Sequence, residues 1–418
     1  MLHKETEFQD SAIGKIPIDW DVRELGDDSI ADLIAGQSPP SSTYNKENRG
    51  LPFLQGKMEF GEIFPSPTTH CSKPIKVAEK DDVLLSVRAP VGDVNIAPFK
   101  CCIGRGLAAI RPKSDRLSHL FLFHYLRLEG KRFEALSTGS TFKAIRKQEI
   151  EKFAVPVPSL VEQRGIVGVL GVVDSAILKV DDVIAKTERL KKGLMQELLT
   201  RGIGPKEYKE TIIGRIPRQW EVTTLADASV SITDGSHFSP KHQEFGYPLA
   251  TVANMRENYI DVDSCYRISK EDYENLARSR DKPEINDVLF SKDGTVGLCI
   301  VFNQKVDLIV LSSIAIIRPD KEKVNPYFLR YVLQSPSVLS RITGSKTGTA
   351  IRRIVLKDLS KVKLPVPKNL VEQSKIVEIL ISVDKKLELE KSEKSHLKRI
   401  KLGLMNLLLN GKIRVKVD

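Results

Sequence analysis

The sequence predicts a mixed α/β protein in which one structural plan occurs twice. Three observations support this: short motifs recur in order, the first part of each copy carries short apolar runs between turn-forming residues, and the second part carries a helical stripe. We therefore expect two mixed α/β domains separated by two long antiparallel coiled-coil helices, related by a pseudo-two-fold internal repeat. The expected boundaries are a first globular domain at 1–157, a long helix at 158–203, a second globular domain at 204–366 and a second long helix at 367–418.

The recurrence of motifs along the chain indicates a tandem duplication. Residues Ile13–Trp20 reappear as Ile213–Trp220, and these segments contain both tryptophans of the chain. The offset between matching motifs increases from 200 residues at this pair to 210 residues at Gly193–Met195 and Gly403–Met405. Ordered matches with a smoothly drifting offset are not expected by chance. The matches between them are Asp82–Ser86 with Asp287–Ser291, Ile110–Pro112 with Ile317–Pro319, Gly139 with Gly348, Pro156–Pro158 with Pro365–Pro367, and Val161–Gln163 with Val371–Gln373.

The first part of each copy is expected to contain β-strands. Short apolar runs occur at Val83–Val87, Leu107–Ile110 and Ile309–Ile317, separated by Gly, Pro, Ser and Asn. Such runs between turn-forming residues are typical of strands in a mixed or mainly β domain. The Pro-x-Pro steps at 156–158 and 365–367 mark where each helical part begins, because proline blocks a helix before it and is tolerated at a helix start.

The second part of each copy shows a helical period. Apolar residues recur at steps of three and four, which predicts helices of about 60 Å carrying an apolar stripe. Because such a helix is longer than a domain of this size, we expect it to pack on its duplicate; the alternative is packing on a domain core. Gly202, Gly204 and Pro205 should end the first helix and Gly411 the second. The expected seam consists of Ile166, Leu170, Val173, Ile177, Leu190 and Leu194 with Ile376, Leu380, Val383, Leu387, Ile400 and Leu404.

The composition is that of a basic globular chain. The 418 residues are 41% hydrophobic and 28% charged, and the net charge of +11 favours a polyanionic partner. The five cysteines are odd in number and form no Cys-x-x-Cys pair, so neither a disulfide framework nor a zinc site is expected. Because no apolar run could span a membrane and no secretory signal is present, we expect a cytoplasmic protein without membrane contact.

No sequence motif predicts catalysis. Asn325-Pro326-Tyr327-Phe328 resembles the Asn/Asp-Pro-Pro-aromatic loop of a DNA-modifying methyltransferase but lacks the second proline. We interpret it as a helix start, with Asn325 as the cap and Pro326 in the first turn. A P-loop, a dinucleotide fingerprint, His-Glu-x-x-His and Gly-x-Ser-x-Gly are all absent. We therefore expect no catalytic residue, no cofactor and no metal.

Polar and basic segments at matching places in the two copies are the candidate DNA-contacting surface. The stretches 139–147 and 344–353 are rich in Gly, Ser and Thr and end on basic side chains, and such groups donate hydrogen bonds to phosphate oxygens. Gln and Asn can pair with adenine, and Lys and Arg with guanine. The plain alternative is that these segments are solvated loops and turns. The candidates are Gln37, Ser38, Lys57, Arg88, Ser140, Thr141, Lys143, Arg146 and Lys147 in copy one and Ser236, His237, Asn254, Lys292, Lys346, Thr347, Arg352 and Arg353 in copy two.

At these motifs the chain resembles a known family. The pattern Phe8-x-Asp10-Ser11-x-Ile13-Gly14-x-Ile16-Pro17-x-x-Trp20, repeated at 208–220, is similar to the opening of the specificity subunits of type I restriction–modification enzymes. The Pro-x-Pro step before Glu162-Gln163 and a long helix, present twice, resembles the paired conserved regions of that family. Gly-Leu-Met followed by leucines also fits, and the resemblance covers essentially the whole chain. One departure is Asn369, which is inserted after the Pro-x-Pro of copy two and leaves the repeat register there open by one residue.

The resemblance implies the DNA-specificity subunit of a type I restriction–modification complex, without catalytic activity of its own. Each globular domain would read one half of a bipartite, asymmetric site in double-stranded DNA. The paired helices would set the half-site spacing and dock two methyltransferase subunits, which bind S-adenosylmethionine and methylate adenine. Motor/nuclease restriction subunits would join for cleavage. Three alternatives remain: the same module in a fused restriction–methylation enzyme of another type, a stand-alone DNA methyltransferase, and an adaptor that uses its helices only for protein contacts.

Overall fold

The computed structural model describes residues 2–137, 143–204, 207–278, 282–344 and 353–415, and it divides the chain into two compact units. Unit 1 comprises Met1–Asp182 together with Ser392–Asp418, and unit 2 comprises Val183–Lys391. Two long helices, α4 (Leu160–Arg201) and α9 (Leu370–Leu408), are therefore each shared between the units. Unit 1 takes the beginning of α4 and the end of α9, and unit 2 takes the remainder of both. Unit 1 is consequently discontinuous in sequence.

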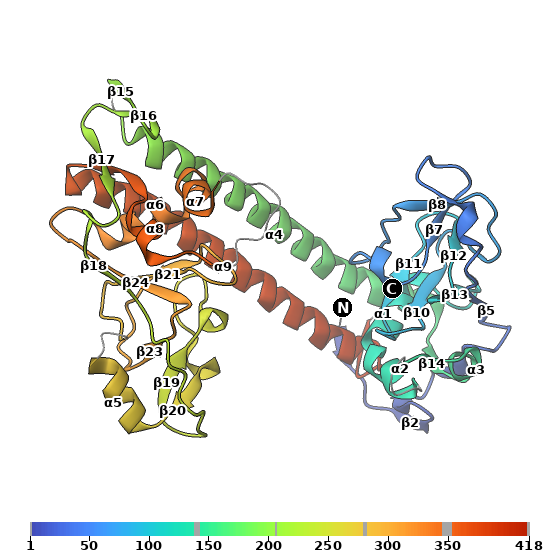
Figure 1. The fold of residues 1–418 in the computed structure, drawn as a ribbon. Coiled ribbons are helices and arrows are strands. Elements are labelled where there is room, and N and C mark those ends of the chain that lie inside the picture. The colour runs from blue at the N-terminus through green and yellow to red at the C-terminus, as the bar shows by residue number, and fades with distance from the viewer. Residues whose placement is uncertain (1, 138–142, 205–206, 279–281, 345–352, 416–418) are drawn as a thin grey trace. The chain divides into compact units, whose positions relative to one another are not determined.

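In its described residues unit 1 contains two sheets and three strand pairs, and Figure 1 labels several of their strands, among them β10 and β13. One sheet is antiparallel, in the order β11 (Val94–Ile96), β10 (Val83–Ser86), β13 (Leu107–Pro112) and β5 (Ala31–Ala35). The other has the order β6 (Tyr44–Asn45), β8 (Thr69–Cys71), β7 (Leu51–Leu54), β12 (Cys101–Ile103) and β9 (Val77–Ala78), with β12 parallel to β7. The strand pairs are β1 (Leu2–Lys4) with β26 (Ile413–Val415), β2 (Phe8–Ser11) with β3 (Gly14–Pro17), and β4 (Asp21–Glu24) with β14 (Ala154–Val157).

The helices of unit 1 pack on one face of its four-stranded sheet. Along β10, Val83 and Leu85 belong to a core shared with the helices, whereas Leu84 belongs to a core shared with the five-stranded sheet. This alternation follows from the two-residue period of a strand, which sends successive side chains to opposite faces. The layers are thus helices, four-stranded sheet and five-stranded sheet. The shorter helices are α1 (His119–Leu128), α2 (Gly130–Leu136), α3 (Lys147–Glu151) and the 3₁₀ turns Ser41–Thr43 and Lys57–Glu59.

Unit 2 repeats the topology of the main sheet. Its four strands have the order β22 (Cys299–Val301), β21 (Val288–Ser291), β24 (Ile314–Pro319) and β18 (Ser229–Asp234), and a smaller sheet has the order β20 (Tyr266–Ile268), β19 (Tyr247–Ala250) and β23 (Ile309–Val310). The remaining pairs are β15 (Tyr208–Thr211) with β16 (Gly214–Pro217) and β17 (Trp220–Thr224) with β25 (Lys363–Pro367). The other helices are α5 (Lys270–Arg278), α6 (Pro326–Gln334), α7 (Pro336–Thr343), α8 (Leu356–Ser360) and the 3₁₀ turns Val252–Asn254 and Val262–Ser264.

Two local expectations meet different outcomes in unit 2. The apolar run Ile309–Ile317 is not one strand, because it contributes β23 to the smaller sheet and the start of β24 to the larger one. An apolar run reports burial but not where the chain turns, so this prediction was wrong. Asn325 is confirmed as a helix cap: its Oδ1 accepts hydrogen bonds from the N–H groups of Tyr327 and Phe328, and Pro326 occupies the first turn of α6.

The repeated Glu-Gln step fastens each long helix to its unit. In unit 1, the side chain of Gln163 accepts a hydrogen bond from Ser118 N (2.7 Å) and donates to the carbonyl oxygens of Arg116 and Pro158. In unit 2, Gln373 makes the same three bonds with Asn325, Lys323 and Pro367. Both glutamines are fully buried. Because Gln163 and Gln373 make equivalent hydrogen bonds, they occupy equivalent positions in the repeat. This fixes the repeat register, which the insertion of Asn369 had left open by one residue.

Each tryptophan lies between the start of the long helix of its own copy and the end of the long helix of the other copy. Trp20 Nε1 donates to Glu162 Oε2 (3.0 Å), and Trp220 Nε1 donates to Glu372 Oε1 (3.1 Å). In unit 2, Gly202 follows the end of α4 with a φ of +69°, and a Cβ there would lie 3.0 Å from Trp220 Cζ2. In unit 1, Gly411 after α9 has a φ of +65°, and a Cβ would lie 2.3 Å from Pro17. Glycine is required at both places.

Within each unit the two helix segments run antiparallel. In unit 1, Asp174 pairs with Lys401 (2.5 Å) and Asp181 with Lys394. In unit 2, Thr187 Oγ1 donates to Glu390 Oε1 (3.1 Å) and Lys191 pairs with Asp384 (2.7 Å). Residue numbers thus rise along α4 as they fall along α9. Lys401 and Lys191 occupy equivalent positions in the repeat, as do Asp174 and Asp384, so both units place an ion pair in the largely buried contact between the helices.

The expected apolar seam is buried along most of its length but departs from the prediction at two positions. Leu190 and Ile400 are each 52% exposed. The neighbouring Lys191 and Lys401 face the opposite helix, and a step of one residue turns a side chain by about 100°. The other seam residues are fully buried (Ile166, Leu170, Ile376, Leu380), nearly so (Ile177, Val383, Leu387) or half-buried (Val173, Leu194, Leu404).

This difference in burial yields the first prediction, for two positions of unit 1. Leu170→Asp should lower the free energy of unfolding of unit 1 by more than about 4 kcal/mol, because it places an unpaired charge in the core. Ile400→Asp should cost less than about 1 kcal/mol, since that side chain is half in solvent. The measurement is urea unfolding followed by Trp20 fluorescence in a Trp220→Phe background. Equal losses in the two variants would contradict the burial pattern.

Candidate nucleic-acid interface

A tight turn after β5 presents polar side chains on the surface of unit 1. At Gly36 a Cβ would lie 2.2 Å from the carbonyl oxygen of Gly104, so only glycine fits. The next residue, Gln37, donates its N–H to Ile103 O (3.1 Å), and Ser38 Oγ accepts a hydrogen bond from Arg105 N (3.1 Å). With its backbone held in this way, Gln37 leaves its side chain exposed. The turn therefore presents the side-chain amide of Gln37 and the exposed guanidinium of Arg105 to an approaching ligand.

Basic side chains surround a small pocket beside this turn. The pocket has a volume of about 200 Å³ and is lined by Gly36, Arg88, Arg105 and Lys147, among others, and every charged residue that lines it in the described part of the chain is basic. Lys143 and Arg146 follow in the adjacent segment and are exposed. Lys143 and Lys147 have weak surface partners, Glu134 (3.6 Å) and Glu151 (3.2 Å). A concentration of cations of this kind suits phosphate oxygens or the acceptor edge of guanine.

Unit 2 repeats the turn with different chemistry. At Gly235 a Cβ would lie 2.0 Å from Val310 O, and Ser236 donates its N–H to that oxygen (2.8 Å), as Gln37 does to Ile103. His237 is exposed, and its Nε2 lies 3.2 Å from Asp234 Oδ2. Arg353 is exposed and forms an isolated β-bridge with Asp293. The two units thus share a scaffold and differ in the side chains that it presents.

Three candidate residues of copy two are part of the scaffold and not of an exposed surface. Ser236 is 4% exposed and its hydroxyl bonds the backbone of Phe238, while Lys292 is 1% exposed and held by two carboxylates. Asn254 is 6% exposed: its Oδ1 accepts hydrogen bonds from Thr251 and its Nδ2 donates to Ser264 O. Their assignment to direct DNA contact is corrected, because short polar residues satisfy buried backbone groups as readily as they contact a ligand.

Arg88 and Lys292 fall near each other in the repeat and are one position apart. The carbonyl oxygen of Lys292 accepts a hydrogen bond from Ile354 N, as that of Val87 does from Ile145 N. Lys292 is therefore equivalent to Val87, and Asp293 to Arg88. The remaining candidates of copy one are half-buried or exposed, with Lys57 paired to Asp93 (2.5 Å). Five candidates lie outside the described residues: Ser140, Thr141, Lys346, Thr347 and Arg352.

Sequence reasoning missed Arg105, Asp234 and Asp293. Arg105 lies in Gly104-Arg105-Gly106, which is too short for a dinucleotide fingerprint. The two aspartates carried a signal that could have found them: each lies within two residues of a predicted candidate, at a position where copy one has no acid (Ala35 and Arg88). A charge difference at an aligned position is visible in the sequence, but its spatial neighbours are not.

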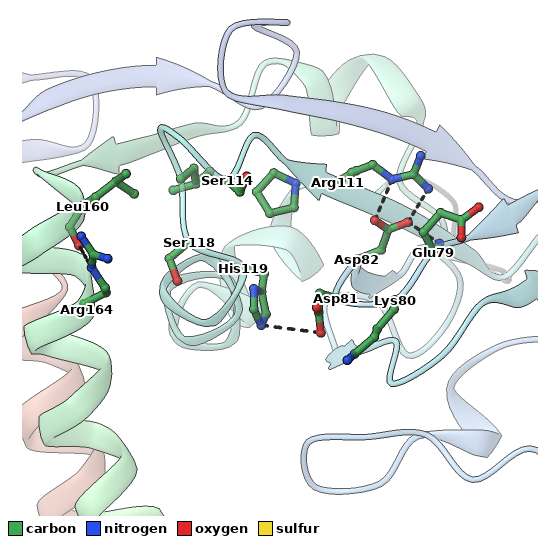
Figure 2. Close-up of a pocket in the computed structure, with 12 residues that line it drawn as sticks. Glu79, Lys80, Asp81, Asp82, Arg111, Ser114, Ser118, His119, Leu160 and Arg164 are labelled. Atoms are coloured by element: carbon green, nitrogen blue, oxygen red, sulfur yellow. Dashed lines mark hydrogen bonds and ion pairs between the residues drawn. The ribbon is translucent and has the colours of Figure 1, made fainter.

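A larger polar pocket in unit 1 is a structural junction (Figure 2). It has a volume of about 500 Å³ and lies where β13, α1 and α4 meet. Arg111 forms two hydrogen bonds of 2.9 Å with the buried carboxylate of Asp82, and His119 Nε2 lies 3.9 Å from Asp81 Oδ1, too far for a hydrogen bond. Arg318 and Asp287 form the same bidentate pair in unit 2. Repetition of this pair in both units indicates a role in folding.

The described residues show few groups suited to metal binding or nucleophilic catalysis. No group of three or more His, Cys, Asp or Glu side chains among them could hold a metal ion. The five cysteines are buried and unpaired, and burial raises the pKa of Cys101 and of Cys299 to about 12, so these thiols are poor nucleophiles at neutral pH. In the described part of the chain no helix is long and apolar enough to cross a membrane.

Comparison with known proteins identifies the family. The model of the type I restriction modification DNA specificity domain matches twice, at residues 17–185 and 217–399. The chain belongs to the type I restriction–modification DNA specificity family. The two matches cover most of the chain and correspond to the two copies of its repeat.

Relatives of known name agree with the family assignment. The putative type I restriction enzyme MjaX specificity subunit of Methanocaldococcus jannaschii is 49% identical over 199 residues, which is 48% of this chain and 47% of that protein. The type I restriction enzyme MjaVIII specificity subunit of the same organism is 28% identical over 99% of this chain and 98% of its own length. Members of the family are thus DNA-recognition subunits and not the catalytic ones.

A solved structure supports the fold. A chain from work on complex assembly and conformational transition of the type I R-M system aligns with a TM-score of 0.59 and 20% identity, over 95% of this specificity-family chain and 99% of that chain. At this identity the likeness concerns the fold alone.

The burial of Asn254 and the exposure of Gln37 predict that substitutions at these two positions differ in their effect on stability. Asn254→Ala should lower the free energy of unfolding of unit 2 by about 2 kcal/mol, because Thr251 N and Ser264 O lose their buried partner. Gln37→Ala should change the stability of unit 1 by less than about 0.5 kcal/mol, since its side chain is exposed. Urea unfolding followed by tryptophan fluorescence measures both. A loss at Gln37 as large as that at Asn254 would reverse the two assignments.

Proposed function

We propose that each unit reads one half of a bipartite, asymmetric site in double-stranded DNA. The observation that carries this proposal is the shared turn, at Gly36 in unit 1 and Gly235 in unit 2, which presents different side chains on the same backbone. A fixed scaffold with variable surface groups is suited to reading two different sequences. The basic pocket of unit 1 and the net charge of +11 support contact with a polyanion.

We infer that α4 and α9 form an antiparallel coiled coil with a pseudo-two-fold relation between the copies. The antiparallel contacts inside each unit and the equivalent ion pairs Asp174–Lys401 and Lys191–Asp384 support this inference. Such a helix pair would hold the half-sites at a constant spacing. It would also offer two equivalent surfaces for two methyltransferase subunits, to which motor/nuclease restriction subunits are added for cleavage. The family assignment supports these partners, and the chain would act with them in the cytoplasm.

Two of the alternatives have less support. A stand-alone methyltransferase would require a methyl-donor site and a catalytic loop, and the segment closest to such a loop, at Asn325, is a helix cap. The names of the relatives favour a separate type I subunit over a module of a fused enzyme. A pure adaptor would not bind DNA. The deciding experiment combines the purified chain with its methyltransferase subunit and sequences the methylated adenines. Two fixed half-sites across a constant gap are expected, and methylation by the chain alone would refute the proposal.

The basic pocket of unit 1 predicts a salt-dependent contribution to binding. Arg105→Ala and Lys147→Ala should each weaken duplex binding and reduce the slope of log K against log[salt] by about 1, as expected for one lost phosphate contact. Arg218→Ala is the matched control, because its exposed pair with Glu207 lies outside the proposed interface. Fluorescence anisotropy with a labelled duplex between 50 and about 200 mM salt measures the slope. Unchanged slopes in both pocket variants would exclude the pocket from the interface.

The role of the helices as a spacer predicts a change in gap length. Four residues inserted in α4 between Asp182 and Val183, with four more in α9 between Lys391 and Ser392, add about one turn, or about 6 Å, to both helices. Because base pairs rise about 3.4 Å, the gap should lengthen by one to two base pairs. Both half-site sequences should be retained. Two-residue insertions at the same points are the control and should disrupt pairing, since they rotate each stripe by about 200°. A fixed gap with altered half-site bases would contradict the spacer role.

A further inference from the structure

Unit 2 places a row of charged groups at the position where unit 1 has its basic pocket. Asp234 ends β18 opposite Ala315, as Ala35 ends β5 opposite Ala108. Lys292 stands in place of Val87, Asp293 in place of Arg88, and Arg353 in place of Ala144, as the β-bridges Asp293–Arg353 and Arg88–Ala144 show. The charges therefore change from three cations in unit 1 to a mixture of carboxylates and cations in unit 2.

The buried lysine of this row fixes the two carboxylates. Lys292 Nζ lies 3.3 Å from Asp234 Oδ2 and 3.4 Å from Asp293 Oδ2, and only 2% of its side chain is exposed. An ammonium so far removed from water requires these partners, and in turn it holds both carboxylates in place. Lys292 is thus a positioning residue for Asp293.

The other oxygen of Asp293 lacks a hydrogen-bond donor. Asp293 Oδ1 is buried and has no hydrogen-bond partner among the described residues, and Arg353 Nε lies 3.7 Å from it, beyond hydrogen-bond distance. Leaving a carboxylate oxygen without a donor is unfavourable, so an incoming donor is favoured. Although Oδ1 itself is buried, the Asp293 side chain as a whole is 25% exposed and that of Arg353 61%, so a base contacts Oδ1 only after neighbouring side chains shift.

We propose that Asp293 and Arg353 together read one C·G base pair in the half-site bound by unit 2. In the major groove cytosine presents the N4 amino donor, and its partner guanine presents the O6 and N7 acceptors. A carboxylate acceptor beside a guanidinium fork complements this pattern: the Asp293 carboxylate accepts from cytosine N4, and Arg353 donates to guanine. A carboxylate repels phosphates, so the row suits base edges better than the DNA backbone. Unit 1, with Arg88 at the same place, has no carboxylate among the described residues that line its pocket and reads a different pattern.

This inference rests on the proposed function and is tested on the complete complex of the chain with its methyltransferase subunit. Methylated adenines are sequenced for the wild type and for the variants Asp293→Ala, Asp293→Asn and Arg353→Ala. Asp293→Ala should reduce the preference for cytosine at one position of one half-site by about 5- to 100-fold. Arg353→Ala should relax the same base pair, and the other half-site should stay unchanged. Glu274→Ala, which removes an exposed acid of α5 elsewhere in unit 2, is the matched control and should leave both half-sites intact.

The outcomes separate the inference from the function on which it depends. A wild-type complex that methylates no bipartite site refutes the proposed function. A bipartite wild-type site whose C·G requirements persist in Asp293→Ala and Arg353→Ala, or whose two half-sites relax together, overturns the inference alone. If Asp293→Ala abolishes methylation through loss of folding, Arg353→Ala decides, because that side chain is 61% exposed and its removal leaves Lys292 paired with both carboxylates. Relaxation at a single C·G pair supports the inference, and an unchanged preference refutes it.

Discussion

Each unit depends on a helix end that reaches it from another part of the chain. In unit 1 the residues Met405, Leu408 and Leu409 of α9 and its following segment enter the same core as Ile166 and Leu170 of α4. Beside this contact Trp20 donates a hydrogen bond to Glu162 and lies close to Gly411. Arg414 forms ion pairs with Glu162, Glu5 and Asp19. These carboxylates raise the pKa of Arg414, chiefly through the hydrogen bonds that Arg414 donates to Glu162, so it remains charged. The turn that presents Gln37 is built on a sheet whose helical face is completed in this way.

The contact between the helices is not purely apolar, and its polar groups differ between units in an informative manner. Lys401 lies near His124 in unit 1, and burial, assisted by the charge of Lys401, lowers the pKa of that histidine to about 4, which keeps it neutral. In unit 2 the equivalent of His124 is Tyr331, which donates a hydrogen bond to Asp384 Oδ2 (2.6 Å). A buried ion pair contributes little net stability, but it penalises any register that would leave its charges unpaired. In both units, therefore, buried polar contacts between the helices constrain the register of α4 against α9.

The sequence was informative where a pattern has a period or a duplicate. The helical stripe located α4 and α9, and the drifting offset revealed two copies that the family comparison also finds. It was uninformative where a residue's role depends on its spatial neighbours. Asn254 and Lys292 have the same residue types as DNA-contacting groups, yet backbone groups and carboxylates engage them inside unit 2. Leu190 and Ile400 match the apolar stripe by spacing alone. The adjacent Lys191 and Lys401 face the opposite helix instead, because each forms an ion pair there with an aspartate.

The discontinuity of unit 1 also sets an order of events on the ribosome. Unit 2 has all its residues once Lys391 has been made, but unit 1 still lacks the segment from Ser392 onward. At about 5–20 residues per second, the 236 residues that follow Asp182 require about 12–47 s. Throughout that interval Ile166 and Leu170 lack the side chains of α9 that cover them in the finished protein. The part of the chain synthesised first is thus the last to be completed, and its nascent form is the one that most needs protection from aggregation.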